Sequence, residues 1–220
     1  MQTIIMNDLL RDRKAAGLQL SKVLAEYKNS NAVVVGIPHG GVCVAAVIAE
    51  ELSLPLEIMP CRRIKHPADG KRAIGSVSED EVFIHDCSHT IPQDYVGHQI
   101  VLLKHAISHE VKKYYGDTTP QSFRYRTVIL VDDILSGSDK MMACLKSIKR
   151  QAPLKVVIAV PIVAAEAAHI VGAEVDDIKF LKMEATLGSP LEYYAEFSKV
   201  DEKSVKALFE ASRKMVKLYE

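Results

Sequence analysis

The chain has 220 residues, of which 48% are hydrophobic and 25% charged, the ordinary composition of a globular protein. Lys plus Arg and Asp plus Glu both total 28, so no net charge favours nucleic acid or an anionic membrane, and any anion must bind at a local site. The apolar runs fall far short of the ~20 residues of a membrane span, and the N-terminus turns polar too early for a signal peptide. We expect one domain over residues 1–220, without a nucleic-acid or membrane partner.

The first part of the chain predicts a βαβ unit. Apolar residues at helical spacing predict an amphipathic helix over 8–28, which Asn7 or Asp8 can cap. Residues 32–37 are continuously apolar, as in a strand buried on both faces. Two elements follow, a helix over 42–52 and a strand over 54–64. Such a crossover implies parallel strands.

The middle of the chain has a different pattern. Residues 65–72 predict a basic loop, and two short apolar stretches then flank a Glu79–Asp80 turn, which indicates a hairpin over 73–85. A helix is predicted over 94–115, followed by a loop over 116–125.

Strands and helices alternate again in the last part. Strands are predicted over 127–131, 154–160 and 178–183, and helices over 138–149, 164–171 and 201–219. The whole pattern predicts an α/β fold with a central parallel sheet flanked by helices. The termini and the 65–125 region are expected to form a hood over one end of the sheet.

Two adjacent carboxylates, Asp132 and Asp133, end the strand over 127–131 and precede a Ser/Gly turn into a helix. Ligands of parallel sheets bind beyond the carboxyl ends of the strands. Two carboxylates there can accept hydrogen bonds from a vicinal diol, and small residues let backbone N–H groups approach an anion. The alternative is an Asp pair that only caps the turn.

A second turn follows the strand over 32–37 and reads Pro38, His39, Gly40, Gly41. The paired glycines expose backbone amides, which suits a pyrophosphate contact, although a plain strand-to-helix turn is the alternative. Both turns lie at strand ends of one predicted sheet, so they can converge on one site.

These segments resemble a known family. Residues 128–139 resemble the ribose-phosphate-binding signature of type I phosphoribosyltransferases, in which a hydrophobic strand ends in two acidic residues before a Thr-Gly-x-Thr phosphate loop. Residues 36–42 are similar to the first turn of a group of bacterial phosphoribosyltransferases that have Pro-Arg-Gly-Gly, here Pro-His-Gly-Gly. Similarity extends to residues 10–17, 63–67, 73–80 and 193–197. It therefore covers nearly the whole chain.

The resemblance implies a glycosyltransferase of nucleotide metabolism that uses 5-phosphoribosyl-1-pyrophosphate with Mg²⁺ as cofactor. By match, Asp132 and Asp133 would be the catalytic residues that bind the ribose hydroxyls, and the turn from Pro38 to Gly41 would contact pyrophosphate. The 5′-phosphate would lie on the backbone of Ser136, Gly137 and Ser138. In such chemistry placement and electrostatics dominate, because charge builds on the leaving pyrophosphate.

Three features depart from the family pattern. His39 replaces a permanent cation, and the phosphate loop is one residue shorter after the Asp pair. Asp139 stands where the loop usually ends in a threonine, and its carboxylate could cap the helix, occupy the phosphate's amides and repel a dianion. Each lost charged contact costs roughly 1.5–3 kcal/mol. Arg63 could supply positive charge in place of the lost contacts. The alternative is that Arg63 lies on a solvated face and binds nothing.

The sequence thus leaves three functions open. The first is a phosphoribosyltransferase with an undefined acceptor, and the second is a catalytically impaired homologue that binds a nucleotide or ribose phosphate as a regulatory module. The third is a hydrolase that uses His39 as acid or base. The expected partner is a small sugar phosphate or nucleotide, and a homodimer is the assembly to test first because dimers are the commonest.

The remaining reactive side chains suggest no further chemistry. No Cys-x-x-Cys pair occurs, which predicts reduced thiols in a cytoplasmic protein. Cys43 follows the Gly-Gly turn, where it could be a nucleophile, but packing as a small buried residue is favoured. We predict no intrinsic metal site. Four tyrosines could stack on a base or pack in the core: Tyr114, Tyr115, Tyr193 and Tyr194.

Overall fold

A computed structural model describes residues 9–70, 72–85 and 90–216. Its centre is a five-stranded sheet in the order β2-β1-β6-β7-β8, in which every neighbouring pair is parallel. The strands are β1 (Ala32–Gly36), β2 (Leu56–Ile58), β6 (Thr127–Val131), β7 (Lys155–Ala164) and β8 (Asp177–Glu184). The predicted α/β fold with a central parallel sheet is therefore confirmed.

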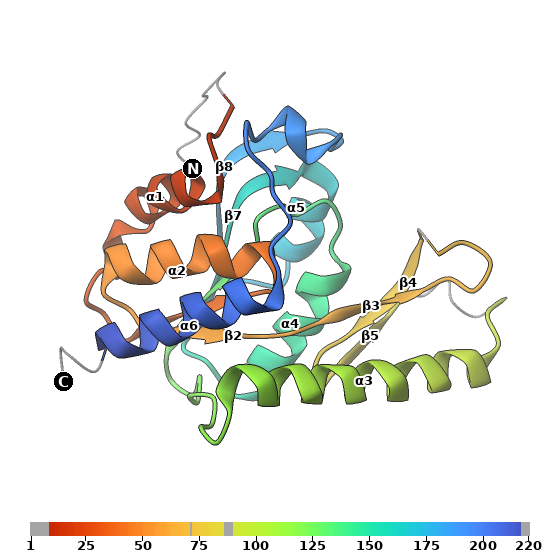
Figure 1. The fold of residues 1–220 in the computed structure, drawn as a ribbon. Helices are drawn as coiled ribbons and strands as arrows, with labels where there is room; N and C mark the ends of the chain where they lie inside the picture. The colour runs from red at the N-terminus through yellow and green to blue at the C-terminus, as the bar shows by residue number, and fades with distance from the viewer. Residues whose placement is uncertain (1–8, 71, 86–89, 217–220) are drawn as a thin grey trace.

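Helices cover both faces of this sheet (Figure 1). One face carries α1 (Arg13–Val23), α2 (Gly40–Leu52) and α6 (Glu202–Val216), and the other carries α4 (Asp139–Arg150) and α5 (Ala165–Gly172). Side chains alternate along each strand, so Val34 and Ile129 pack under the first group of helices while Val33 and Val128 pack under the second. Burial on both faces explains the continuously apolar strands.

A smaller antiparallel sheet stands beside the main one (Figure 1). It consists of β3 (Arg62–Lys65), β4 (Ala73–Val77) and β5 (Val82–Ile84), in that order. The long helix α3 (Gln93–Tyr115) closes it, with a core built around Ile64, Ile74 and Ile107. The predicted hairpin is thus present, and it packs along α4.

The structure corrects the predicted elements in three places. The strand expected over 54–64 is divided between the two sheets, because residues 59–61 separate β2 from β3 and Pro60 has no N–H for a ladder bond. The first helix begins at Arg13 and is capped by Asp12, whose side chain accepts from the Ala15 N–H at 2.7 Å. The caps proposed at residues 7 and 8 lie outside the described residues.

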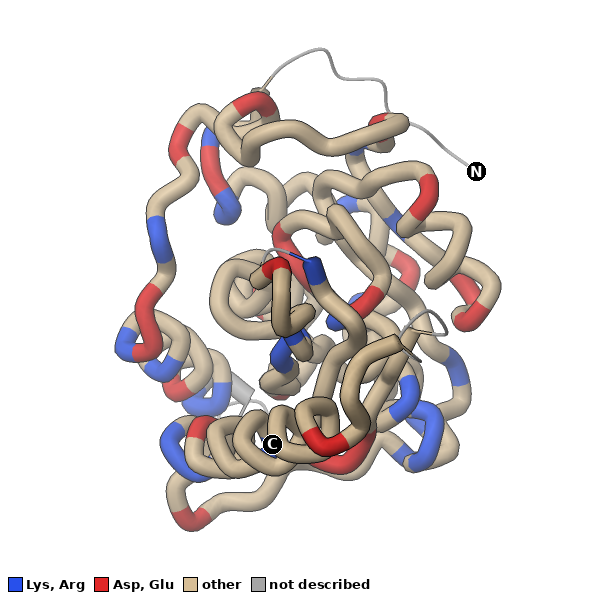
Figure 2. The backbone as a smooth tube through the Cα atoms, turned by 90° about the vertical axis from the view of Figure 1, so that its right-hand side faces the viewer, with Lys and Arg blue, Asp and Glu red and all other residues tan. Residues whose placement is uncertain are grey.

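The region expected to form a hood is divided between two places. Helices α1 and α6 pack with α2 on a face of the sheet, whereas β3, β4, β5 and α3 stand beside its strand ends. The terminal parts of the chain reach the strand ends through Arg13, which contacts Asp133 and the Ser198 carbonyl. Figure 2 shows basic and acidic residues interspersed over the chain, in keeping with equal numbers of each. Among the described helices, none combines the length and apolarity that crossing a membrane requires.

Candidate functional site

The two predicted turns share one rim of the main sheet. Strands β1 and β6 are parallel neighbours with Gly36 opposite Val131, and the Ile37 N–H donates to the Val131 carbonyl at 2.9 Å. A Cβ added at Gly40 would overlap the Asp133 carboxylate, and one at Gly41 would lie 2.8 Å from the Asp132 Cα. The glycines are therefore needed so that the backbone of one turn can contact the other.

Asp132 is buried and its carboxylate is fully engaged. Its side chain is 3% exposed, with Oδ2 2.9 Å from the Lys140 Nζ, while Oδ1 accepts from the Asp133 N–H at 2.9 Å. Burial raises the pKa of Asp132 to about 6, although the Lys140 ammonium acts in the opposite direction. The carboxylate in turn raises the pKa of Lys140. The pair therefore keeps its charge at neutral pH at a cost in desolvation.

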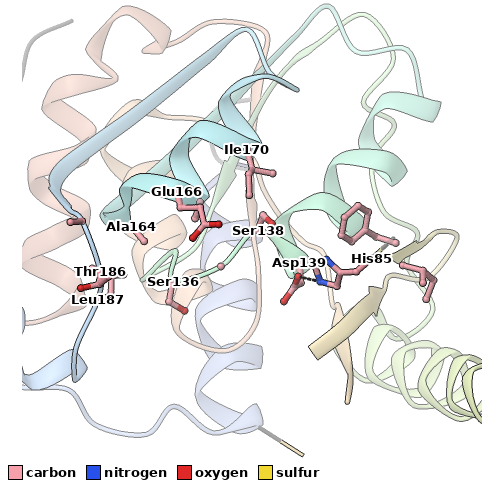
Figure 3. A pocket seen from close by; sticks show the side chains of 14 residues that line it. His85, Ser136, Ser138, Asp139, Ala164, Glu166, Ile170, Thr186 and Leu187 are labelled. Atoms are coloured by element: carbon pink, nitrogen blue, oxygen red, sulfur yellow. Dashed lines mark ion pairs between the residues drawn. The ribbon is translucent and has the colours of Figure 1, made fainter. Parts of the chain in front are cut away.

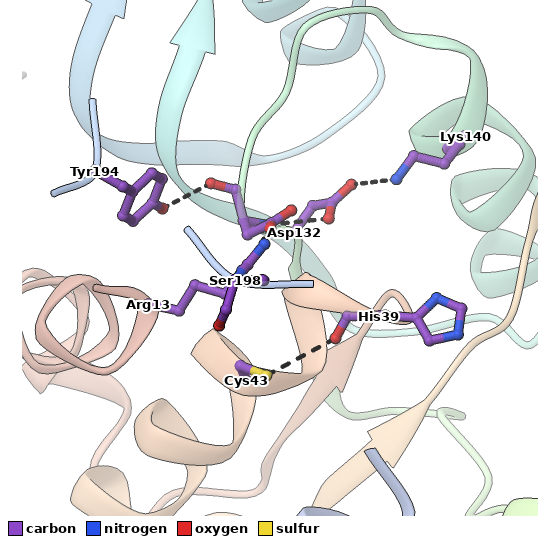
Figure 4. A network of polar contacts seen from close by, with 8 residues as sticks. Arg13, His39, Cys43, Asp132, Lys140, Tyr194 and Ser198 are labelled. Carbon is purple, nitrogen blue, oxygen red and sulfur yellow. Dashed lines mark hydrogen bonds and ion pairs between the residues drawn. The ribbon is translucent and has the colours of Figure 1, made fainter. Parts of the chain in front are cut away.

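Asp133 is held by a second cation, Arg13 (Figure 4). The Arg13 Nε lies 2.7 Å from Oδ2 of Asp133, and the guanidinium also donates to the Ser198 carbonyl at 2.8 Å. Its Cζ lies 3.8 Å from the centroid of the Phe197 ring. Tyr194 donates to the Asp133 carbonyl at 2.9 Å. The C-terminal segment thus fixes the second carboxylate of the pair.

The predicted phosphate loop opens onto a cavity of about 680 Å³ (Figure 3). Leu135 anchors the loop to β7, because its N–H donates to the Ile162 carbonyl and its carbonyl accepts from the Ala164 N–H. The cavity is lined by the loop, the start of α5, the end of β5 and the segment after β8: Ser136, Gly137, Ser138, Asp139, Phe83, Ile84, His85, Ala164, Glu166, Ala167, Ile170, Ala185, Thr186 and Leu187. Among the described residues no side-chain cap bond is present at the start of α4, and Ser138 and Asp139 at this start line the cavity.

Asp139 does not cap α4, contrary to the prediction, because its carboxylate turns towards two basic residues of the small sheet. Its Oδ1 lies 2.5 Å from the His85 Nε2, and its Oδ2 lies 3.9 Å from the Arg63 Nε. Ser76 donates to the Asp139 carbonyl. The Arg63 guanidinium also comes 3.9 Å from a Cβ built on Gly137, which places it at the phosphate loop.

Several sequence hypotheses about single residues are decided by burial. Burial raises the pKa of the Cys43 thiol, which disfavours a nucleophile and agrees with packing. All four tyrosines considered for base stacking are buried, at 7% exposure or less. The His39 ring is turned away from Asp132 in Figure 4, which gives the hydrolase hypothesis no support.

Metal-ligating residues do not cluster in the described part of the chain. In the described ranges, no group of three or more His, Cys, Asp and Glu side chains could hold an ion. The sequence does contain one spacing that our prediction overlooked, since His105 and His109 lie four residues apart and exposed on α3. Two ligands on one helix do not complete a site of four.

Sequence reasoning missed Arg13 and Lys140, the cations that bind the Asp pair. Arg13 lies in the segment 10–17 that carries part of the resemblance, which is a signal for its importance. Lys140 follows Asp139 at the start of α4, where the pattern resembles an ordinary solvated helix turn. Only the packing of α4 against β6 brings its ammonium to Asp132.

The chain is similar to known proteins in sequence and in fold. The chain is 27% identical over 211 residues to candidate phosphoribosyl transferases from two strains of Mycobacterium tuberculosis, a match that covers 94% of this chain and 47% of theirs. It therefore spans about half the length of these curated relatives. The crystal structure of TT1426 from Thermus thermophilus is 27% identical and covers 92% of this chain and 98% of its own, with a TM-score of 0.78.

A purine phosphoribosyltransferase from Pyrococcus horikoshii Ot3 shares the fold at 14% identity, with a TM-score of 0.51 over 86% of this chain and 92% of its own. The family model described as the phosphoribosyl transferase domain matches residues 9–185, which include both turns, the Asp pair and the phosphate loop. This chain belongs to the phosphoribosyl transferase domain family.

Proposed function

We propose that this chain binds a ribose 5-phosphate group, as part of 5-phosphoribosyl-1-pyrophosphate, and transfers the phosphoribosyl group to an acceptor. The observation that carries the proposal is the convergence of the Asp132–Asp133 pair with the Gly40–Gly41 turn at one rim, next to the 680 Å³ cavity over the phosphate loop. A ribose phosphate has a phosphate, a diol and an anomeric substituent, and this rim offers a matching group for each.

The 5′-phosphate would lie on the amides between Ser136 and the first turn of α4. Those amides carry no side-chain cap, and the helix N-terminus favours an anion. The Asp139 carboxylate would repel a dianion, but the approach of the Arg63 guanidinium offsets part of that charge, and the carboxylate is also in contact with His85. Arg63 thus supplies a cation at the phosphate loop, away from the turn in which His39 replaces arginine.

The ribose hydroxyls would be bound by Asp133 and the pyrophosphate by the turn from Pro38 to Gly41. Mg²⁺ commonly binds proteins through one or two carboxylates together with substrate phosphates, so a site without a full protein cage fits that mode. When bound, the ion would neutralise charge on the leaving pyrophosphate. The Asp133 side chain is 15% exposed, whereas that of Asp132 is 3% exposed, so Asp133 is the carboxylate of the pair that a ligand or ion can reach.

The residues of this chain would act by placement and electrostatics. The Asp pair would hold the ribose, and its negative charge favours an oxocarbenium-like sugar as the anomeric bond breaks. The Gly40 and Gly41 amides would stabilise the departing oxyanion. No residue of the rim needs to form a covalent bond to the sugar.

Calorimetric titration tests the proposal directly. We expect sub-millimolar binding of 5-phosphoribosyl-1-pyrophosphate that depends on Mg²⁺, and weaker binding of ribose 5-phosphate. Gly137→Asp should abolish both, because it adds a carboxylate to the phosphate loop. Gly137→Ala is the matched control, since its Cβ has only Arg63 nearby at 3.9 Å. No binding of either ligand by the unmodified chain would refute the proposal.

A second function, a binding module without turnover, has one observation in its favour. Both carboxylates of the Asp pair are already bound to cations of the chain, which leaves them fewer free oxygen lone pairs for a ribose. Pyrophosphate release separates the two functions. An enzyme should release pyrophosphate with at least one acceptor from a panel of nucleobases and amines, whereas a module should bind the sugar pyrophosphate and leave it intact.

A further inference from the structure

Two thiols from segments far apart in the sequence lie against each other. Cys61 belongs to residues 59–61, which join β2 of the main sheet to β3 of the small sheet, and Cys144 lies in the middle of α4. The Cys144 thiol is hydrogen-bonded to Cys61, and both pack in the core beneath α4 and α5. Sulfur atoms in hydrogen-bond contact need only a small movement to reach bonding distance.

The surroundings give the two thiols different roles. Cys144 is fully buried, whereas Cys61 is half-buried and open to an oxidant. The hydrogen bond to Cys61, together with burial, raises the pKa of the Cys144 thiol, so Cys144 keeps its proton. Lys140, one turn before Cys144 on α4, is within electrostatic range of Cys61. The thiolate is the form that attacks a peroxide, and the more exposed thiol of the pair is the one that a peroxide can reach.

We propose that Cys61 and Cys144 form an oxidation site at which a hydroperoxide produces a reversible intramolecular disulfide. The Cys61 thiolate attacks the peroxide, the O–O bond breaks, and Cys61 becomes a sulfenic acid while the peroxide leaves as an alcohol or water. The Cys144 sulfur then attacks the Cys61 sulfur, its proton goes to the leaving hydroxide, and water is released. Two electrons pass from the two thiols to the peroxide. A dithiol reductant reverses the bond by exchange.

Cys43, the third described cysteine, has no neighbouring thiol in the residues that the structure describes and so differs from Cys61 and Cys144. It is also half-buried, but its sulfur contacts the His39 carbonyl at 3.9 Å, and its surroundings include Arg13 and Asp133 rather than a second thiol. Oxidation of Cys43 therefore has no resolving partner among the described residues and cannot close an internal bridge.

The disulfide would change the binding site because each of its two cysteines lies near a residue of that site. This effect rests on the proposed function. Cys61 lies two residues before Arg63, whose guanidinium reaches the phosphate loop, and Cys144 lies one turn from Lys140, which holds Asp132. Shortening a sulfur contact to a bond of about 2.05 Å pulls these segments together. We expect the oxidised chain to bind 5-phosphoribosyl-1-pyrophosphate about tenfold more weakly, since small misplacements of a site are costly.

Peptide mapping tests the bridge independently of ligand binding. The full-length chain is treated with hydrogen peroxide, alkylated, and digested without reduction by trypsin and a glutamate-specific protease, which separates Cys61 from Cys43. The expected product joins residues 58–62 to residues 141–146, is lighter than the two reduced peptides by two hydrogen atoms, and disappears with dithiothreitol. Cys43→Ser should leave it unchanged, and Cys61→Ser, at a half-buried position that tolerates the change, should abolish it.

The outcomes separate this proposal from the proposed function. A bridge that forms at Cys43, only between chains, or not at all would overturn the oxidation site, whatever the chain binds. If the bridge forms and the reduced and oxidised chains bind the sugar pyrophosphate equally, the coupling to the site is wrong. If neither form binds it, the proposed function fails while the mapped disulfide still stands.

Discussion

The Lys140 ammonium lies 2.9 Å from the Asp132 carboxylate, and this ion pair joins the first turn of α4 to the end of β6 beneath the phosphate loop. Asp132 is buried and Lys140 is partly buried, and the ion pair between them holds the start of α4 against the rim. Removing one partner of a buried pair leaves an uncompensated charge, which costs more than the pair contributes when intact.

Lys140→Met should therefore destabilise the fold. We expect a loss of about 2–4 kcal/mol in the free energy of unfolding, measured by urea denaturation, because Asp132 would remain buried and alone. Lys149→Met is the matched control on the same helix, since the Lys149–Glu174 pair is about half exposed and should contribute about 0.5 kcal/mol. Asp132→Asn combined with Lys140→Met should recover part of the loss. Equal losses in the two lysine variants would show that the buried pair is not special.

The raised pKa of Asp132 predicts how stability depends on pH. Its pKa is about 6 in the folded chain against an ordinary value of 3.8, so the folded state binds the proton more tightly. Such a group stabilises the fold at low pH, and its contribution is lost as the pH rises from about 4 to 6. The change is up to about 3 kcal/mol. The Lys140 pKa is raised far above this range and does not contribute to it.

Comparison with Asp132→Asn isolates this effect, because Glu57 and Glu79 also have raised pKa values. The difference in unfolding free energy between the original chain and the variant should move in favour of the variant between pH 4 and pH 7. A difference that stays constant across this range would mean that Asp132 titrates at its ordinary pKa.

Asp139 and His85 should change phosphate binding in opposite directions. Asp139→Asn removes a carboxylate from the cavity, and we expect ribose 5-phosphate to bind about tenfold more tightly. His85→Ala leaves the Asp139 charge without its 2.5 Å partner and should weaken binding by a similar factor. Asp177→Asn, at the opposite end of β8, controls for net charge. Calorimetry at low salt measures all three, and tighter binding by the His85 variant would contradict this account.

The fold could be predicted from the sequence because the pattern of apolar residues along the chain reports which segments are strands or helices and which of their faces are buried. Buried strands such as β1 and β6 are continuously apolar, and the glycine turn and Asp pair follow directly from them. Their convergence could be predicted because parallel strands end at a common edge. The division at Pro60 was missed because residues 54–64 have strand character throughout, and only the tertiary structure assigns its two halves to different sheets.

The charges around the site could not be predicted in the same way. Arg13 reaches Asp133 across 120 residues of chain, and His85 reaches Asp139 from the small sheet, so no local spacing relates them. The sequence suggested that Asp139 could cap α4, because carboxylates at helix starts often do. The nearby imidazole and guanidinium offer it a stronger partner than a backbone amide.

Gly40 tests whether the close contact between the two turns is required. Gly40→Ala places a Cβ where the Asp133 carboxylate lies, and the Arg13 Nε is 2.8 Å from the same point. Because that carboxylate is fixed by Arg13 and by the backbone around it, we expect the variant to lose about 1–3 kcal/mol in the free energy of unfolding. Binding of 5-phosphoribosyl-1-pyrophosphate should weaken with it, because both turns are displaced.

Gly97→Ala is the matched control for this substitution. Gly97 is exposed on α3, a Cβ there meets nothing within 4 Å, and alanine stabilises a helix interior by about 0.5–1 kcal/mol relative to glycine. The two variants should therefore differ in the sign of their effect on urea denaturation. If Gly40→Ala were as stable as the original chain and bound the sugar pyrophosphate unchanged, the two turns would not depend on each other, and the shared rim could not be the binding site.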